Sequence, residues 1–171
     1  MNPEIEKPLF HPTGQGLNFL WLELTSRCNL RCIHCYAESS PHPQRPDILT
    51  RIDYLKLIDS AALLGYRKIQ FIGGEPTIVR ELPEYIFHAK HNGFEFIEVF
   101  TNATRISDSL LSCFVDNNVA VATSFYDHKS EIHDTITKKL GSHRLTVNTI
   151  KRVIDFGLDI RVGVIIMNEN R

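Results

Sequence analysis

Apolar residues along the chain fall into five short runs, each bounded by turn residues or by polar stretches. The runs are FLWLELT (19–25), RKIQFI (67–72), FEFIEVFT (94–101), VAVATSF (119–125) and DIRVGVIIM (159–167). Short runs of this kind, rich in β-branched and aromatic residues, are typical of strands. All are well below the roughly 20 apolar residues that a membrane-spanning helix needs. The pattern therefore predicts five strands and no membrane segment.

Amphipathic stretches separate these runs and carry apolar residues at helical spacing. They predict helices over 52–65, 82–92, 107–116 and 145–156. Because strand and helix alternate along the chain, we expect parallel strands that are joined by right-handed crossovers. The fold class predicted is α/β, with five strands and four helices in a partial parallel (β/α) barrel.

The two ends of the chain differ from this alternating pattern. Residues 1–17 contain Pro, Gly and His without a clear period, so we expect an irregular leader there. Residues 18–171 form the predicted core domain. Its last strand ends close to Arg171, and nothing after it covers the strand's free edge. We therefore expect a barrel that is truncated before its sixth strand.

A stretch rich in His, Asp and Lys lies between the fourth strand and the last helix. Its three histidines show no metal-ligand spacing, and its lysine pair is typical of a surface. We expect a solvated loop here; the residues concerned are His128, His133, His143, Lys138 and Lys139.

Composition limits the classes of function. The 171 residues are 43% hydrophobic and 23% charged, which fits one soluble globular domain. The net charge of -1 gives no electrostatic case for nucleic acid as the partner. The N-terminus lacks the apolar stretch of a signal peptide, so a cytoplasmic location is expected.

Three of the four cysteines lie within eight residues: Cys28, Cys32 and Cys35. A disulfide framework is disfavoured, because three crowded thiols leave one unpaired and no secretory signal accompanies them. Thiolates are the ligands that iron–sulfur clusters and zinc prefer. Cys113 stands apart in a predicted helix and is expected to be a small, buried apolar residue.

Two kinds of metal site remain open at this point. A four-iron cluster held by three cysteines would leave one iron free to bind a substrate, much as an open position marks a catalytic zinc site. The alternative is a structural zinc ion with His34 or His42 as its fourth ligand.

The order of two motifs resembles a known family. The CxxxCxxC motif at 28–35 follows the first strand, and Gly73-Gly74-Glu75-Pro76 follows the second. This pair resembles the radical S-adenosylmethionine (SAM) superfamily, and the resemblance covers roughly residues 19–168. The segment 101–103 (TNA) and the region 124–127 look most like members that modify peptides or proteins and carry an extra cluster-binding domain, called SPASM or twitch.

The resemblance implies roles for individual residues. Cys28, Cys32 and Cys35 would ligate three irons of a 4Fe-4S cluster. SAM would bind the fourth iron, and its contacts would come from Gly73, Gly74, Glu75, Pro76, Ser124, His34 and Asn168. Asn102 is expected to cap the following segment rather than to contact the ligand. Thr137 and Lys138 stand where relatives frequently have an arginine, so an anion contact is not carried over there.

The resemblance also implies the chemistry. Reductive cleavage of SAM would give a radical that abstracts hydrogen from the substrate, a peptide or a protein side chain, so the chain would be an oxidoreductase. A flavodoxin or ferredoxin would supply the electron. The alternative is a truncated, non-catalytic iron–sulfur module for electron transfer.

Overall fold

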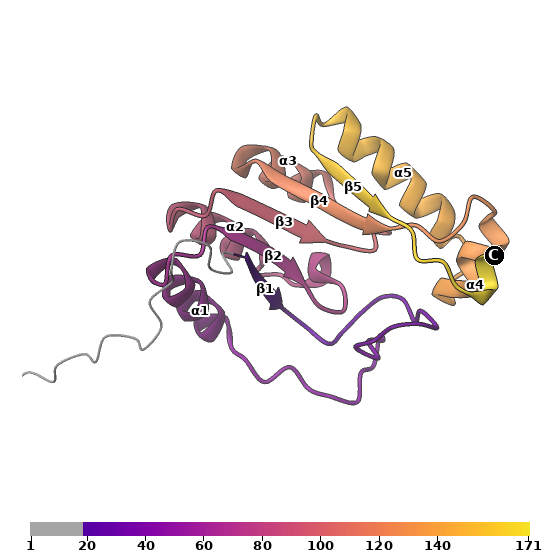
Figure 1. Cartoon of the computed structure of the whole chain (residues 1–171), viewed down its shortest axis with the longest axis horizontal. Coiled ribbons are helices and arrows are strands. Elements are labelled where there is room, and N and C mark those ends of the chain that lie inside the picture. The colour runs from indigo at the N-terminus through magenta and orange to yellow at the C-terminus, as the bar shows by residue number, and fades with distance from the viewer. Residues whose placement is uncertain (1–18) are drawn as a thin grey trace, which may run out of the picture.

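The computed structural model describes residues 19–171, so the predicted leader at 1–17 and the start of the core domain at 18 lie outside the described residues. One sheet of five parallel strands forms the centre of the fold (Figure 1), in the order β1-β2-β3-β4-β5. The strands are β1 (Phe19–Glu23), β2 (Lys68–Ile72), β3 (Phe96–Phe100), β4 (Val119–Ser124) and β5 (Ile160–Gly163). All four pairings are parallel, and the sheet is not closed. The predicted partial barrel is therefore confirmed.

Helices follow the strands in regular alternation. Residues 19–171 contain α1 (Arg51–Leu63), α2 (Leu82–His91), α3 (Asp108–Asn117), α4 (Ser130–Thr137) and α5 (Ser142–Asp155), with short 3-10 helices η1 (Pro76–Ile78) and η2 (Asn168–Asn170). Figure 1 shows α4 near the end to which the strand arrows point, whereas the other α-helices run along the sheet. None of these helices is long and apolar enough to span a membrane.

The hydrophobic core lies between the sheet and the helices. Alternate strand residues point toward it, such as Phe71, Val99 and Val121, and each of these is fully buried. Ile58 of α1 and Leu111 of α3 belong to the same buried cluster. The helices therefore cover one face of the sheet.

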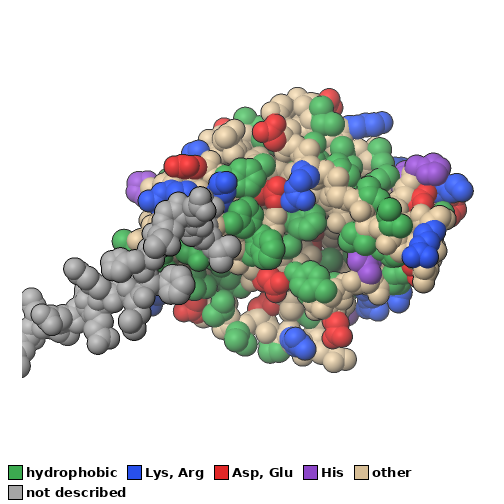
Figure 2. Space-filling view, viewed as in Figure 1, with side chains coloured by type: hydrophobic (Ala, Val, Ile, Leu, Met, Phe, Trp, Pro, Cys, Tyr) green, Lys and Arg blue, Asp and Glu red, His purple; other side chains and the backbone are tan. Residues whose placement is uncertain are grey.

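The other face of the sheet carries the remaining strand residues. Trp21, Gln70 and Glu98 are register partners across β1, β2 and β3. The buried Glu98 carboxylate accepts hydrogen bonds from the Gln70 amide and, at 2.9 Å, from the Arg161 guanidinium. Trp21 is 69% exposed, and Phe96 is exposed as well. Figure 2 shows hydrophobic side chains gathered over the strands in this view.

Three predictions of element boundaries are wrong. The stretch after β4 is not a loop but contains α4, and the last helix begins at Ser142 rather than 145. The left-handed backbone of Lys138 and Gly141 breaks what would otherwise be one helix into α4 and α5. The fifth strand ends at Gly163, because residues beyond it leave the pairing with β4.

Candidate functional site

A cavity of about 190 Å³ opens at the carboxyl ends of the strands. Parallel strands deliver the residues that follow them to the same edge of the sheet, so segments distant in sequence meet there. The predicted site residues that line this cavity are Cys28, Cys32, His34, Cys35, Gly73, Gly74 and Ser124. The cysteine motif, the two glycines and the strand-end serine therefore face one space.

Three predicted site residues do not line the cavity. Glu75 is 1% exposed and Pro76 is also buried, both in the turn behind it. Asn168 lies exposed in η2, five residues beyond the end of β5 at Gly163. The expectation that Asn168 closes the fifth strand is wrong, because the strand ends at Gly163, whereas its contact with a cofactor stays a prediction.

The cysteine loop is attached to the last turn of α4. The backbone N–H of Ile33 donates to the carbonyl oxygen of Ile136 at 2.9 Å, and that of Arg31 donates to Thr137 at 3.2 Å. These carbonyls are among the groups that a helix leaves unpaired at its C-terminal end. A loop of residues 28–35 without strand or helix structure therefore has a fixed place beside the sheet.

Backbone N–H groups point at two of the three thiols. Leu30 donates to the sulfur of Cys28 at 3.4 Å, and Ser39 donates to the sulfur of Cys35 at 3.3 Å. Burial raises the pKa of Cys28, and it raises the pKa of Cys32 to about 12. Burial thus favours protonated thiols, whereas coordination to a metal deprotonates them. The buried sulfurs of this loop therefore need a cationic partner, such as a metal, to be stable as thiolates.

The two metal sites left open by the sequence need different arrangements of ligands. Among residues 19–171, no three His, Cys, Asp or Glu side chains are grouped so that they could hold one metal ion. A zinc ion needs four ligands at about 2.0–2.3 Å from one point. A cubane cluster instead binds each cysteine at a different iron. Three cysteines can therefore ligate three irons of a four-iron cluster and leave the fourth iron open.

The two glycines allow the GGEP turn to pack against the chain that leads into the cysteine loop. A Cβ atom on Gly73 would lie 2.7 Å from the Thr25 carbonyl oxygen, and one on Gly74 would lie 2.1 Å from that of Arg27. Gly73 also has a φ of +133°, which side chains disfavour. The backbone N–H of Gly74 donates to Thr25 at 2.6 Å. The glycines therefore join the two motifs directly.

Glu75 fixes the turn from within. Its carboxylate accepts hydrogen bonds from the hydroxyls of Thr77 and Thr101, both at 2.6 Å, and from the backbone N–H of Asn102 at 2.7 Å. Burial raises the pKa of Glu75, and these hydrogen bonds oppose that rise. Glu75 thus connects the GGEP turn to the segment after β3.

An aromatic cluster beside the cysteine loop was missed from the sequence. His133 is 1% exposed, and its Nδ1 accepts from the backbone N–H of Tyr126 at 3.4 Å. The rings of His34 and Tyr126 lie 4.9 Å apart, and those of His133 and His143 lie 5.5 Å apart. Burial lowers the pKa of His133 to about 4. The prediction that His133 belongs to a solvated loop is wrong, because α4 directs it inward.

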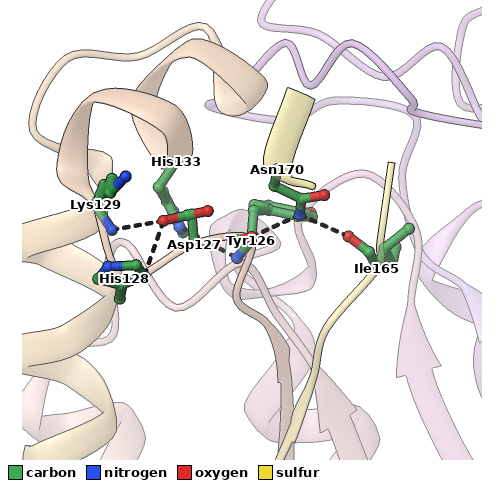
Figure 3. Close-up of polar contacts among 7 residues, drawn as sticks. All are labelled: Tyr126, Asp127, His128, Lys129, His133, Ile165 and Asn170. Atoms are coloured by element: carbon green, nitrogen blue, oxygen red, sulfur yellow. Dashed lines mark hydrogen bonds and ion pairs between the residues drawn. The ribbon is translucent and has the colours of Figure 1, made fainter. Parts of the chain in front are cut away.

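Figure 3 shows how the neighbourhood of Tyr126 is tied together. The Asn170 amide donates to the carbonyl oxygens of Tyr126 at 2.6 Å and Ile165 at 2.8 Å. One side chain therefore bridges the segments that follow β4 and β5. His128 lies at the surface, with its side chain 84% exposed, as the sequence predicted.

Comparisons with known proteins place these features in a family. The model of the Radical SAM superfamily matches residues 22–170. The GTP 3′,8-cyclase of Clostridium botulinum (strain Okra / Type B1) is 30% identical over 157 residues, which make up 90% of this chain and 49% of that protein. AlbA of Bacillus subtilis (strain 168), the antilisterial bacteriocin subtilosin biosynthesis protein, is 30% identical over 153 residues, covering 86% of this chain and 33% of AlbA. The chain thus spans half or less of the length of these relatives.

Solved structures share the fold. SuiB of Streptococcus suis superposes with a TM-score of 0.73 at 16% identity, over 88% of this chain and 33% of SuiB. The structure of anSMEcpe with bound AdoMet gives a TM-score of 0.68 at 19% identity, over 84% of this chain and 42% of that protein. At these identities the likeness supports the partial-barrel architecture.

Proposed function

Because this chain belongs to the radical SAM superfamily, we propose that its three clustered cysteines hold a 4Fe-4S cluster and that SAM binds in the cavity beside them. Members of this superfamily are enzymes that use both groups. The residues proposed for the cluster are Cys28, Cys32 and Cys35. The observation that carries the proposal is the shared cavity, which these three side chains line together with Gly73 and Gly74.

The lining of the cavity fits a polar ligand. His34 Nδ1 and Ser39 Oγ are buried and have no hydrogen-bond partner, although both residues line it. Buried polar atoms are nearly always hydrogen-bonded, so unpaired ones at a cavity are available to a ligand. Ser124 offers a further hydroxyl from the end of β4. We propose these three residues, with the two glycines, as contacts of SAM, and Glu75 and Pro76 as the support of the turn.

When bound and reduced, the cluster would supply the electron for cleaving SAM, which would allow hydrogen abstraction from a substrate. The residues of the chain position SAM and the cluster and shield them from water. Ile72, Phe100 and Tyr126 provide apolar surface around the cavity, which keeps water and competing hydrogen donors away.

We propose a peptide or protein side chain as the substrate. AlbA takes part in bacteriocin biosynthesis, and SuiB has been seen bound to its precursor peptide SuiA. The sheet face below the cavity supports this choice. It exposes the aromatic side chains of Trp21 and Phe96, and the charge of Arg161 is paired with the Glu98 carboxylate. The triphosphate of a nucleotide substrate would instead need cationic side chains that are not already paired with carboxylates.

A nucleotide substrate is the second candidate. It is favoured by the GTP 3′,8-cyclase relatives, which match up to 90% of this chain. The two candidates differ in a simple way: added GTP is itself consumed during SAM cleavage only if the chain uses a nucleotide.

An external one-electron donor of the flavodoxin or ferredoxin type completes the proposal. Only Cys113 remains among the four cysteines of the chain, and it lies in α3 away from the cavity lining. One further thiol does not provide the ligands of a second cluster.

We propose a cytoplasmic location, because all four cysteines are free thiols, as is usual in a reducing compartment.

The decisive experiment is SAM cleavage by the anaerobically reconstituted protein. We expect about four irons per chain, no zinc, and formation of 5′-deoxyadenosine after reduction with dithionite. The Cys32→Ala variant, which lacks one thiol, should form none. An intact cluster without 5′-deoxyadenosine would instead assign the chain to electron transfer, and zinc without iron would exclude the proposal altogether.

A further inference from the structure

Asn102, the residue two positions after β3, lines the cavity with its side-chain amide directed at the cysteine loop. Its Nδ2 lies 3.6 Å from the sulfur of Cys28 and 2.8 Å from Oδ1 of Asn29. Both protons of the amide NH2 group therefore have an acceptor. The sequence predicts that Asn102 caps the following segment, and its amide oxygen does accept from the backbone N–H of Thr104, although the N-cap of α3 itself is Ser107.

The orientation of this amide follows from its neighbours. Its oxygen accepts from the backbone N–H of Thr104 at 3.0 Å and from the Thr104 hydroxyl at 2.6 Å. A backbone N–H can only donate, so the oxygen must face Thr104 and the NH2 group must face Cys28. A flipped amide would lose the hydrogen bond from Thr104 and turn its oxygen toward the sulfur.

The backbone of Asn102 is held as firmly as its side chain. Its N–H donates to the buried Glu75 carboxylate at 2.7 Å, and its carbonyl oxygen accepts from the Thr146 hydroxyl at 3.1 Å. Asn102 thus joins the GGEP turn, α5 and the cysteine loop at one point. Such a residue keeps its donor in place when the charge of the loop changes.

We infer that Asn102 is a positioning residue that sets the reduction potential of the cluster through its N–H···S hydrogen bond to Cys28. The inference rests on the proposed function, in which Cys28 ligates an iron. Hydrogen bonds to the sulfurs of an iron–sulfur cluster are among the features that set its potential. A donor stabilises the added negative charge of the reduced state, so it makes reduction easier.

A side-chain donor differs from the backbone donors at this site. Leu30 and Ser39 direct backbone N–H groups at Cys28 and Cys35, and no substitution other than proline, which also constrains the backbone, removes these. The Asn102 amide can be changed alone. This makes the contribution of one hydrogen bond measurable.

The test is a redox titration of the reconstituted protein followed by electron paramagnetic resonance. Asn102→Asp keeps the shape and the oxygen that accepts from Thr104 but replaces the donor with a negative oxygen. We expect the ratio of reduced to oxidised cluster at a fixed potential to fall at least tenfold, which corresponds to 59 mV for a one-electron couple. Asn102→Ala removes the donor without adding charge and should shift the ratio in the same direction by less.

Asn117→Asp is the matched control. The Asn117 amide also lies near a sulfur, at 3.8 Å from that of Cys113, but Cys113 does not line the cavity. Its titration should match that of the wild-type protein. Wild-type midpoints in both Asn102 variants, at full iron content, would overturn the inference while leaving the proposed function intact. Failure of both variants to assemble a cluster that the control assembles would also overturn it, because Asn102 would then be needed to build the site. A wild-type protein without a cluster would instead refute the proposed function.

Discussion

Gly74 and Arg27 approach so closely that a Cβ atom on the glycine would lie 2.1 Å from the arginine's carbonyl oxygen. Next to this contact, the backbone N–H of Glu75 donates to the same oxygen at 2.9 Å. Two motifs almost 40 residues apart are therefore joined through their backbones. This contact brings the cysteine loop and the GGEP turn to one cavity, whatever ligand occupies it.

Replacing Gly74 with Ala is expected to destabilise the fold even without cofactors. The new methyl group meets backbone atoms that cannot rotate away, which should cost about 2–3 kcal/mol. Urea unfolding of the cofactor-free protein measures the loss. Gly163→Ala is the control, because its Cβ would lie 3.8 Å from the nearest atom, the Thr123 oxygen. Equal stability of the two variants would contradict the argument.

Removing the Asp134 carboxylate should loosen the junction of α4 and α5. It accepts hydrogen bonds from the backbone N–H groups of Gly141 at 2.6 Å and His143 at 2.8 Å, and from the Ser142 hydroxyl at 2.8 Å. We expect Asp134→Ala to lower the free energy of unfolding by about 1–3 kcal/mol. Asp116→Ala, at an exposed position of α3, should change it by less than about 0.5 kcal/mol.

The same Asp134→Ala variant should also load less iron. The last carbonyls of α4 accept hydrogen bonds from the cysteine loop, so a looser junction releases the loop. Iron per chain after reconstitution checks this expectation. Wild-type iron content in a clearly destabilised variant would show that the loop does not depend on α4.

Acid should destabilise the cofactor-free protein through His133. Burial lowers its pKa to about 4 in the folded chain, whereas an unfolded chain has the ordinary value of about 6.5. Between these values the unfolded state binds the extra proton, so stability falls as pH drops. From pH 7 to pH 5 we expect a loss of about 1–2 kcal/mol from this residue.

Urea unfolding at the two pH values measures the His133 effect. His133→Gln should reduce the pH dependence by that amount, even if it lowers stability overall. The control is His128→Gln, which replaces a histidine whose side chain is 84% exposed. A His133→Gln protein with the wild-type pH dependence would contradict the assignment.

The four cysteines should separate into two groups by iron binding. Serine in place of Cys28, Cys32 or Cys35 weakens a thiolate contact, and each variant should retain less than about half of the wild-type iron because the cluster needs all three. Cys113→Ser should bind iron normally. Iron content and the visible absorption of the reconstituted proteins report the result, and a loss of iron on changing Cys113 would contradict the site.

Local pattern was enough to predict the sheet. The five apolar runs at 19–25, 67–72, 94–101, 119–125 and 159–167 each contain an observed strand, because a buried strand needs apolar residues over its own length. The alternation with helices fixes parallel order and right-handed crossovers. Parallel order in turn directs the cysteine motif and the GGEP turn to the same end of the sheet.

The spacing of apolar residues did not predict the helix boundaries after β4. Asp134 caps the start of α5 from within the preceding helix, and Lys138 and Gly141 adopt left-handed backbone between the two. A periodicity of apolar residues does not reveal a cap that comes from seven or more positions away. The sequence pattern therefore predicted a loop between β4 and the last helix.

By itself, the sequence determined the fold class, the cysteine triplet and its pairing with the two glycines, since composition and spacing along the chain carry these. Only the tertiary structure decided which polar groups are buried and what they contact. In the folded chain His133 is buried in the core and Asn102 donates to Cys28. Asn168 lies at the surface. The physical reason is that burial and hydrogen-bond partners come from segments tens of residues apart, which only the folded sheet brings together.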